Sequence, residues 1–122
     1  MTTEDELRSF LDYIARHEGT FNQPGGGYDT TLGYGRYLPG GKEMDLSSMR
    51  LADVDRLQKQ MLANPANPYN SSAAGRYQIV NKTLRGLVDK LGLDWNDKFS
   101  PAVQDRMGAT LAEARGNNPA SL

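Results

Sequence analysis

The segment between residues 21 and 41 places the strongest constraint on how this chain can fold. Glycine is its commonest residue, and it also holds two prolines and four aromatic residues. Glycine and proline are the least favourable residues inside a helix, whereas turns and short strands use them readily. The sequence therefore predicts a small β element in this segment, with a hairpin over residues 28–37.

A helical pattern comes before this segment. Thr3 and Glu6 have the spacing of a capping box, which marks the start of a helix. Gly19 is a residue type that commonly ends one. Between these signals, four apolar residues at helical spacing form one face: Leu7, Phe10, Leu11 and Ile14. We therefore predict a first helix that begins after Thr3 and ends at Gly19.

Three further helices are predicted after the glycine-rich segment. Apolar spacing indicates one over residues 51–63, and Asn81 is expected to cap another that runs to about residue 91. Ser100–Pro101 is a typical helix start, and the helix that it begins is expected to end at Gly116. The predicted fold class is therefore α+β and mostly helical, with a small Gly-rich β-hairpin lobe.

Length and charge restrict what such a chain can be. It has 122 residues, which fits a single domain over residues 1–122 with a flexible tail over residues 117–122. Its net charge of −1 argues against nucleic-acid binding, which relies on a basic surface. No apolar run approaches the length of a membrane span. The polar start MTTEDELRS lacks the basic and apolar regions of a secretory signal, so we expect none.

Several kinds of chemistry can be set aside. The chain has no cysteine, which excludes disulfides and thiolate metal sites. Its single histidine, His17, is more typical of a structural residue than of a metal ligand, and a Ser-His-Asp triad would depend on it alone. The glycine-rich segment lacks the G-K-[ST] ending of a phosphate-binding loop. We therefore expect neither a metal nor a cofactor.

Carboxylate chemistry remains. Glu18 lies at the end of the first predicted helix, where its charge faces the negative end of the helix dipole at a cost of about 0.3–1 kcal/mol. It is either a surface glutamate or the acid that glycosidic cleavage needs beside the leaving oxygen. The tyrosines at positions 28, 34, 37 and 77 likewise either fill a core or stack on sugar rings. Residue spacing alone leaves both questions open.

Four blocks of sequence, in this order, resemble those of the phage-lambda-type lysozymes, a family of the lysozyme superfamily. The blocks are FLDYIARHEGT, GYDTTLGYG, SSAAGRYQIV and FSPAVQDRMG, and the resemblance covers nearly the whole chain. SAAGRYQ also resembles the S-x-x-G-x-Y-Q block of soluble lytic transglycosylases and goose-type lysozymes. The resemblance implies a lysozyme-like fold whose hairpin lobe flanks an active-site cleft, and an enzyme that cleaves peptidoglycan.

The resemblance also implies roles for individual residues. Glu18, which precedes Gly19 and Thr20 in the E-G-T block, would be the sole catalytic acid and base. The F-S-P-x-x-Q-D block would be architectural, because it begins a packing helix. Gly75 is expected to let the backbone approach the sugar closely. Glycan contacts are expected at Tyr28, Asp29, Ser72, Gly75, Tyr77 and Gln78, and by stacking at Tyr34.

Three functions stay open at this point. The family's course is lytic transglycosylation, in which Glu18 cleaves the MurNAc-β-1,4-GlcNAc bond and leaves a 1,6-anhydro-MurNAc end, and this is our leading prediction. A hydrolytic muramidase would instead use Glu18 with Asp29 or with an activated water. Asp29 suits a backbone cap in a turn equally well. The third alternative is a non-catalytic wall-binding structural module with the same fold.

The expected partner is the glycan strand of peptidoglycan. The chain departs from the family in a longer middle insert, LADVDRLQKQMLA, which is predicted to be helical, and in ending soon after the F-S-P helix. We therefore expect either a compact monomeric member or a domain of a larger virion or cell-wall protein. Without a secretory signal, it is expected to be made in the bacterial cytoplasm. It would then reach the periplasm or cell wall after release, or as part of a virion or secretion apparatus.

Overall fold

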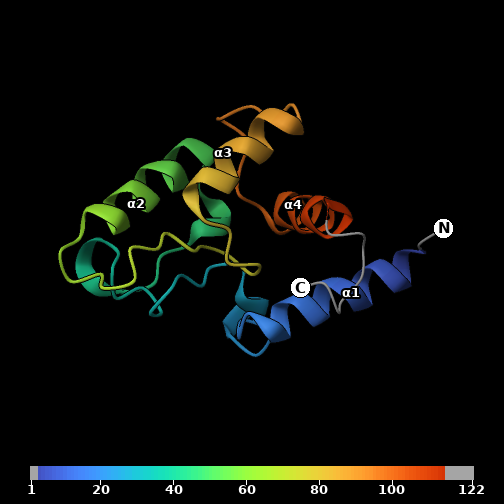
Figure 1. Ribbon diagram of the computed structural model, residues 1–122, viewed down its shortest axis with the longest axis horizontal. Coiled ribbons are helices and arrows are strands. Elements are labelled where there is room, and N and C mark those ends of the chain that lie inside the picture. The colour runs from blue at the N-terminus through green and yellow to red at the C-terminus, as the bar shows by residue number, and fades with distance from the viewer. Residues whose placement is uncertain (1–2, 115–122) are drawn as a thin grey trace.

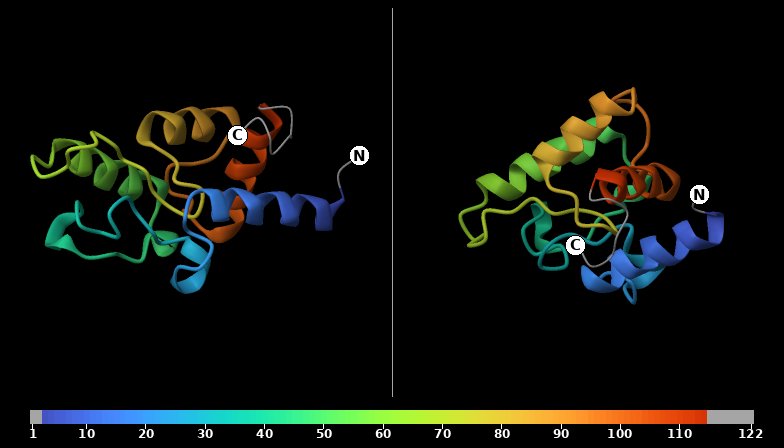
Figure 2. Two further views of the ribbon diagram at one scale, coloured as in Figure 1. Left: turned by 60° about the horizontal axis from the view of Figure 1, so that its bottom comes forward. Right: turned by 45° about the vertical axis from the view of Figure 1, so that its right-hand side comes forward.

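The structure, a computed structural model, describes residues 3–114 (Figure 1). These residues contain four α-helices: α1 (Glu4–His17), α2 (Leu51–Ala63), α3 (Asn81–Lys90) and α4 (Pro101–Ala114). Helix α1 packs against α4, and α2 packs against α3. The long connection between α1 and α2 lies beside the segment that leads from α2 to α3 (Figure 2). The prediction of a mostly helical chain is confirmed.

Helix α1 forms for the reasons that its sequence indicates. The Thr3 side chain accepts a hydrogen bond from the Glu6 N–H group at 3.1 Å, as an N-cap does. The apolar stripe turns inward: Phe10, Leu11 and Ile14 are buried, as is Ala15, and Leu7 is partly buried against the same core. Glu18 is the C-cap residue, and Gly19 follows it with a φ angle of +76°, which ends the helix as predicted.

The starts of the last two helices differ from each other. The Ser100 hydroxyl accepts from the Val103 N–H group at 3.2 Å, which confirms Ser100 as the cap of α4. Asn81, predicted to cap α3, is instead the first residue of that helix. Its N–H group donates to the Ser72 hydroxyl at 2.7 Å, so the cap comes from a residue distant in sequence. The predicted end of α4 at Gly116 and the tail over residues 117–122 lie outside the described residues.

The β-hairpin predicted over residues 28–37 is wrong, because residues 3–114 contain no β-strand. Backbone N–H groups in this region bond to carbonyls three residues earlier, as Tyr34 does to Thr31 at 2.9 Å. Its glycines have positive φ angles, which reverse the chain every few residues and prevent the extended backbone of a strand. Residues 28–37 therefore form successive turns. Short 3-10 helices lie on either side of them, at Pro24–Gly27, Pro39–Gly41 and Leu46–Ser48.

The turns pair with residues 72–79, called here the 72–79 segment. Single β-bridges join Ala74 to Thr31 and to Ile79. Two backbone hydrogen bonds extend this contact, from Leu32 to the Ala73 carbonyl and from Gly75 to the Thr30 carbonyl. The 72–79 segment is thus held in the middle of the molecule, between the turns and the helices.

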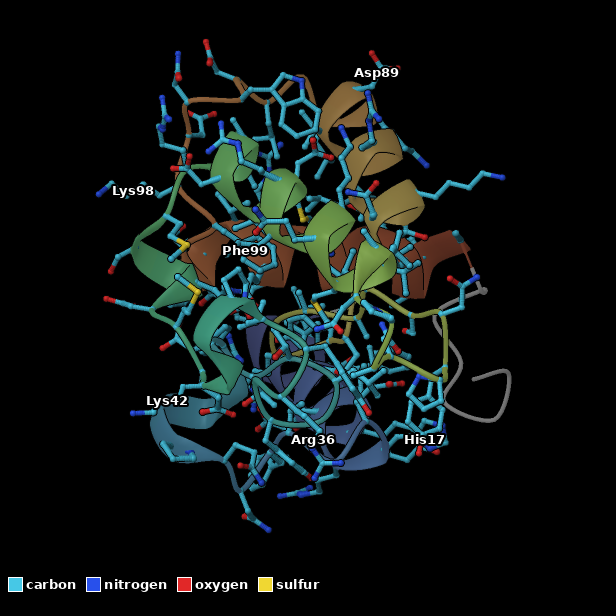
Figure 3. All side chains as sticks on the ribbon, turned by 90° about the vertical axis from the view of Figure 1, so that its left-hand side faces the viewer. His17, Arg36, Lys42, Asp89, Lys98 and Phe99 are labelled. Carbon is cyan, nitrogen blue, oxygen red and sulfur yellow. The ribbon has the colours of Figure 1, made fainter. Side chains whose placement is uncertain are left out.

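The core surrounds this segment. Phe99 is fully buried, and its ring points into the interior in Figure 3. Two glutamines in the core are also buried and bond to the 72–79 segment. Gln58 of α2 donates to the Ser72 and Ile79 carbonyls, and Gln104 of α4 accepts from the Arg76 N–H group. No helix within residues 3–114 is long and apolar enough to cross a membrane.

Candidate active site

Glu18 lines a pocket of about 210 Å³ at the end of α1. The side chain is exposed, and none of the ion pairs among the described residues involves it. The pocket has walls from α1, the 72–79 segment, α3 and α4. The other residues that line it are Ile14, Tyr77, Gln78, Ile79, Val80, Thr83, Gly108, Leu111 and Ala112. Among the described residues that line it, Glu18 is the only acidic one, and most of the others are apolar.

Thr20 fixes the end of α1 against the opposite wall of the pocket. It is 1% exposed, and its hydroxyl donates to the Arg76 carbonyl. The same hydroxyl lies 3.2 Å from the carbonyl oxygen of Ala15 in α1. Thr20 follows Glu18 by two residues, and Arg76 precedes Gln78 by two. The hydrogen bond between Thr20 and Arg76 therefore fixes the position of Glu18 relative to Gln78.

Gln78 is one of the two predicted glycan contacts that share the pocket with Glu18. Its φ angle is +50°, which is uncommon for a residue with a side chain and is often associated with function. The side-chain nitrogen donates to the Thr30 carbonyl at 3.0 Å and to the Gly75 carbonyl at 2.8 Å. With the nitrogen committed, the side-chain oxygen of Gln78 is the atom that can accept a hydrogen bond from a ligand.

Tyr77 is the other predicted contact in the pocket. Its hydroxyl donates to Asp105 at 2.6 Å and accepts from Arg76 at 3.1 Å. Burial raises the pKa of this hydroxyl, and the hydrogen bond to Asp105 raises it further. The hydroxyl therefore stays protonated and engaged with protein groups, so Tyr77 contributes its ring to the pocket rather than an acid or base.

Arg76 is a residue that the sequence analysis did not single out. It is 5% exposed, and its guanidinium lies 2.9 Å from an oxygen of Asp12 and donates to the Gly26 carbonyl at 2.9 Å. A buried cation needs several compensating partners, and aromatic rings add to its hydrogen bonds through cation–π attraction. The rings around the guanidinium are those of Phe21, Tyr28 and Tyr77. An arginine amid the small residues of SSAAGRYQIV was the one signal that could have indicated this centre.

The carboxylates of Asp12 and Asp105 are engaged with arginines. Asp12 is paired with Arg76, and Asp105 is paired with Arg8 at 2.5 Å. Asp105 also accepts from two tyrosine hydroxyls, those of Tyr28 and Tyr77. These carboxylates hold α1, α4 and the 72–79 segment together, and neither lines the Glu18 pocket.

Asp29 has a structural partner as well. One of its carboxylate oxygens accepts from the Ser47 N–H group at 2.8 Å, and the side chain is half-buried. The contact joins the glycine-rich turns to the short 3-10 helix that begins at Leu46. Of the two roles considered for Asp29, this geometry corresponds to a backbone cap. Asp29 does not line the pocket that contains Glu18.

The remaining predicted contacts lie apart from that pocket. Ser72 is 2% exposed and caps α3. Gly75 has a φ angle of +80°, and a Cβ there would meet the Gln104 side chain and the Phe99 ring, so protein atoms occupy the space expected for a sugar. Tyr28 is half-buried, whereas Tyr34 is 59% exposed with a φ angle of +56°. Among the described residues, no group of His, Cys, Asp and Glu could hold a metal ion.

A family model described as Endolysin matches residues 8–120, which is most of the chain. No curated protein and no solved structure matches the chain.

Proposed function

Because the chain belongs to the Endolysin family of peptidoglycan-degrading enzymes, we propose that it cleaves the MurNAc-β-1,4-GlcNAc bond as a lytic transglycosylase. Glu18 acts alone as general acid and then as general base. The observation that carries this proposal is that Glu18 is the only acidic residue lining its pocket within residues 3–114, while Asp12, Asp29 and Asp105 are engaged elsewhere. A single carboxylate is enough for a transglycosylase, whereas a retaining hydrolase needs two.

The proposed reaction has two proton transfers. Protonated Glu18 donates its proton to the glycosidic oxygen, the bond between MurNAc C1 and that oxygen breaks, and the GlcNAc product leaves with a free hydroxyl. The resulting carboxylate then removes the proton from the C6 hydroxyl of the same MurNAc. Oxygen O6 attacks C1 and closes the 1,6-anhydro ring, and Glu18 is again protonated. No water is consumed in this sequence.

The pocket residues supply binding rather than chemistry. The free side-chain oxygen of Gln78 accepts a hydrogen bond from a hydroxyl or N-acetyl N–H group of the glycan. The Tyr77 ring and the apolar lining face the sugar rings. Exposed Tyr34, held in a left-handed conformation between two glycines, offers a stacking surface farther along the strand. For Ser72, Gly75, Tyr28 and Asp29 we propose architectural roles, in keeping with their contacts.

Product analysis tests the reaction type. Purified peptidoglycan digested with the protein is expected to yield muropeptides with 1,6-anhydro-MurNAc ends, each lighter by one water than its reducing counterpart. Mass spectrometry after separation distinguishes the two, and sodium borohydride reduces only the hydrolytic ends. Products with reducing ends alone would replace this proposal with a hydrolytic muramidase, for which exposed Glu18 gives water ready access.

Substitution of Asp29 tests whether a second carboxylate takes part. Asp29→Asn keeps the oxygen that accepts from Ser47 and removes the negative charge, so we expect lytic activity within about twofold of the parent. A carboxylate that takes part in the chemistry would instead cost about 10²-fold or more. The matched variant Asp29→Ala removes the acceptor itself and should lower the free energy of unfolding by about 1–2 kcal/mol. Turbidity loss of cell walls and urea unfolding measure the two effects separately.

A further inference from the structure

Gly108 stands in the interior of α4, a position that is unfavourable for glycine. It is buried, and it is one of the residues that line the Glu18 pocket. Helix propensity alone would favour alanine here. The described helices offer a direct comparison in Gly86 of α3, where an added Cβ would meet nothing within 4 Å. Gly108 differs because a Cβ added there would meet neighbouring side chains.

The space beside Gly108 is filled by Tyr77 and Leu11. A Cβ at Gly108 would lie 2.9 Å from Cδ2 and 3.0 Å from Cε2 of the Tyr77 ring. It would also lie 3.1 Å from Cδ2 of Leu11. Distances this short between carbon atoms require one of the groups to move. Glycine at this position therefore lets α4 approach the Cδ2–Cε2 side of the Tyr77 ring closely.

The ring has little freedom to move inward. Its hydroxyl is held between Asp105 and Arg76, at 2.6 Å and 3.1 Å. Leu11, the other side chain beside position 108, is 1% exposed and packed among other apolar residues. The Glu18 pocket is the open space that the ring borders. A side chain at position 108 would consequently push the ring toward that pocket.

We propose that Gly108 is a positioning residue that sets the shape of the Glu18 pocket through the Tyr77 ring. It makes no contact with the reacting atoms. Its effect on a glycan comes from where it allows the ring to lie, and this part of the inference rests on the proposed function of the pocket. Its effect on the ring itself is independent of that function.

The experiment compares Gly108→Ala with Gly86→Ala, both in a Glu18→Gln background that prevents turnover. The probe is the glycan tetrasaccharide (GlcNAc-MurNAc)2, and its Kd is measured by calorimetry. We expect Gly108→Ala to raise the Kd about tenfold, because the displaced ring fills part of the pocket and loses its packing against the sugar, and the loss of one aromatic contact is worth about that factor. Gly86→Ala should leave the Kd unchanged. A crystal structure of Gly108→Ala should show the Tyr77 ring displaced toward residue 18.

The crystal structure separates the two proposals. If the parent does not bind the tetrasaccharide, the proposed function fails, and the position of the ring alone decides the role of Gly108. A ring that stays in place, or an unchanged Kd in a parent that binds, overturns the inference. If Gly108→Ala does not fold, the double variant Gly108→Ala/Leu11→Val, which removes the closest Leu11 atom, is compared with Leu11→Val. Failure of this variant to fold would show that Gly108 serves packing alone, and would also overturn the inference.

Discussion

Replacing Glu18 with glutamine is expected to abolish peptidoglycan cleavage and to leave the fold intact. The amide occupies the same volume but cannot donate a proton to the leaving oxygen. General acid and base catalysis each contribute roughly 10²–10⁴-fold, and Glu18 is proposed to perform both. We therefore expect the rate to fall by at least about 10³-fold. Stability should change little, because the side chain is exposed and belongs to none of the ion pairs found among the described residues.

The measurement is the release of soluble muropeptides from purified cell walls, with urea unfolding as the check on folding. Glu43→Gln is the matched control, because Glu43 is another exposed glutamate and lies outside the pocket. It should retain full activity. Cleavage by Glu18→Gln at more than about a tenth of the parent rate would remove Glu18 from the mechanism. An inactive parent that still binds glycan would point to the third alternative, a non-catalytic module.

The helices could be predicted from the sequence because their signals are local. Thr3, Gly19 and Ser100 end or begin helices through contacts within a few residues, and apolar spacing indicates the buried face. The hairpin could not be predicted correctly for the opposite reason. Glycine and tyrosine at alternating positions suit a strand as well as a series of turns. Which one forms depends on whether the backbone pairs with itself or with a distant partner, here the 72–79 segment.

The candidate site likewise contains residues that the sequence indicates and residues that only the packing of the helices brings together. The sequence makes Glu18 a candidate through its unfavourable place at a helix end and the family resemblance, and in the structure it lines a pocket with Tyr77 and Gln78. The remaining lining comes from single residues of α3 and α4, such as Thr83 and Gly108, whose roles depend on how the helices pack. Side chains such as Gln58, Arg76 and Gln104 act through partners many residues away. Spacing along the chain carries no signal for such contacts.

Arg76 is the residue outside the pocket whose loss should be most damaging to the fold. Its guanidinium joins α1 through Asp12, the glycine-rich turns through the Gly26 carbonyl, and the 72–79 segment through the Tyr77 hydroxyl. Arg76→Met keeps most of the buried volume but removes all three contacts. The pairing that Asp12 then keeps among the described residues is a longer one with Arg8, at 3.7 Å. Removing one partner of a buried ion pair typically costs about 3–5 kcal/mol.

The expected loss for Arg76→Met is about 3 kcal/mol in the free energy of unfolding, at the lower end of that range. The reason is that the Asp12 side chain is 27% exposed, so water can solvate it once the arginine is gone. Urea unfolding measures the loss, and Arg36→Met, at an exposed arginine, should stay within about 0.5 kcal/mol of the parent. Arg76→Lys should recover part of the loss, because the ammonium can still pair with Asp12 but cannot reach all three partners. If Arg76→Met lowered the free energy of unfolding by less than about 1 kcal/mol, the contacts of the Arg76 guanidinium would contribute little to stability.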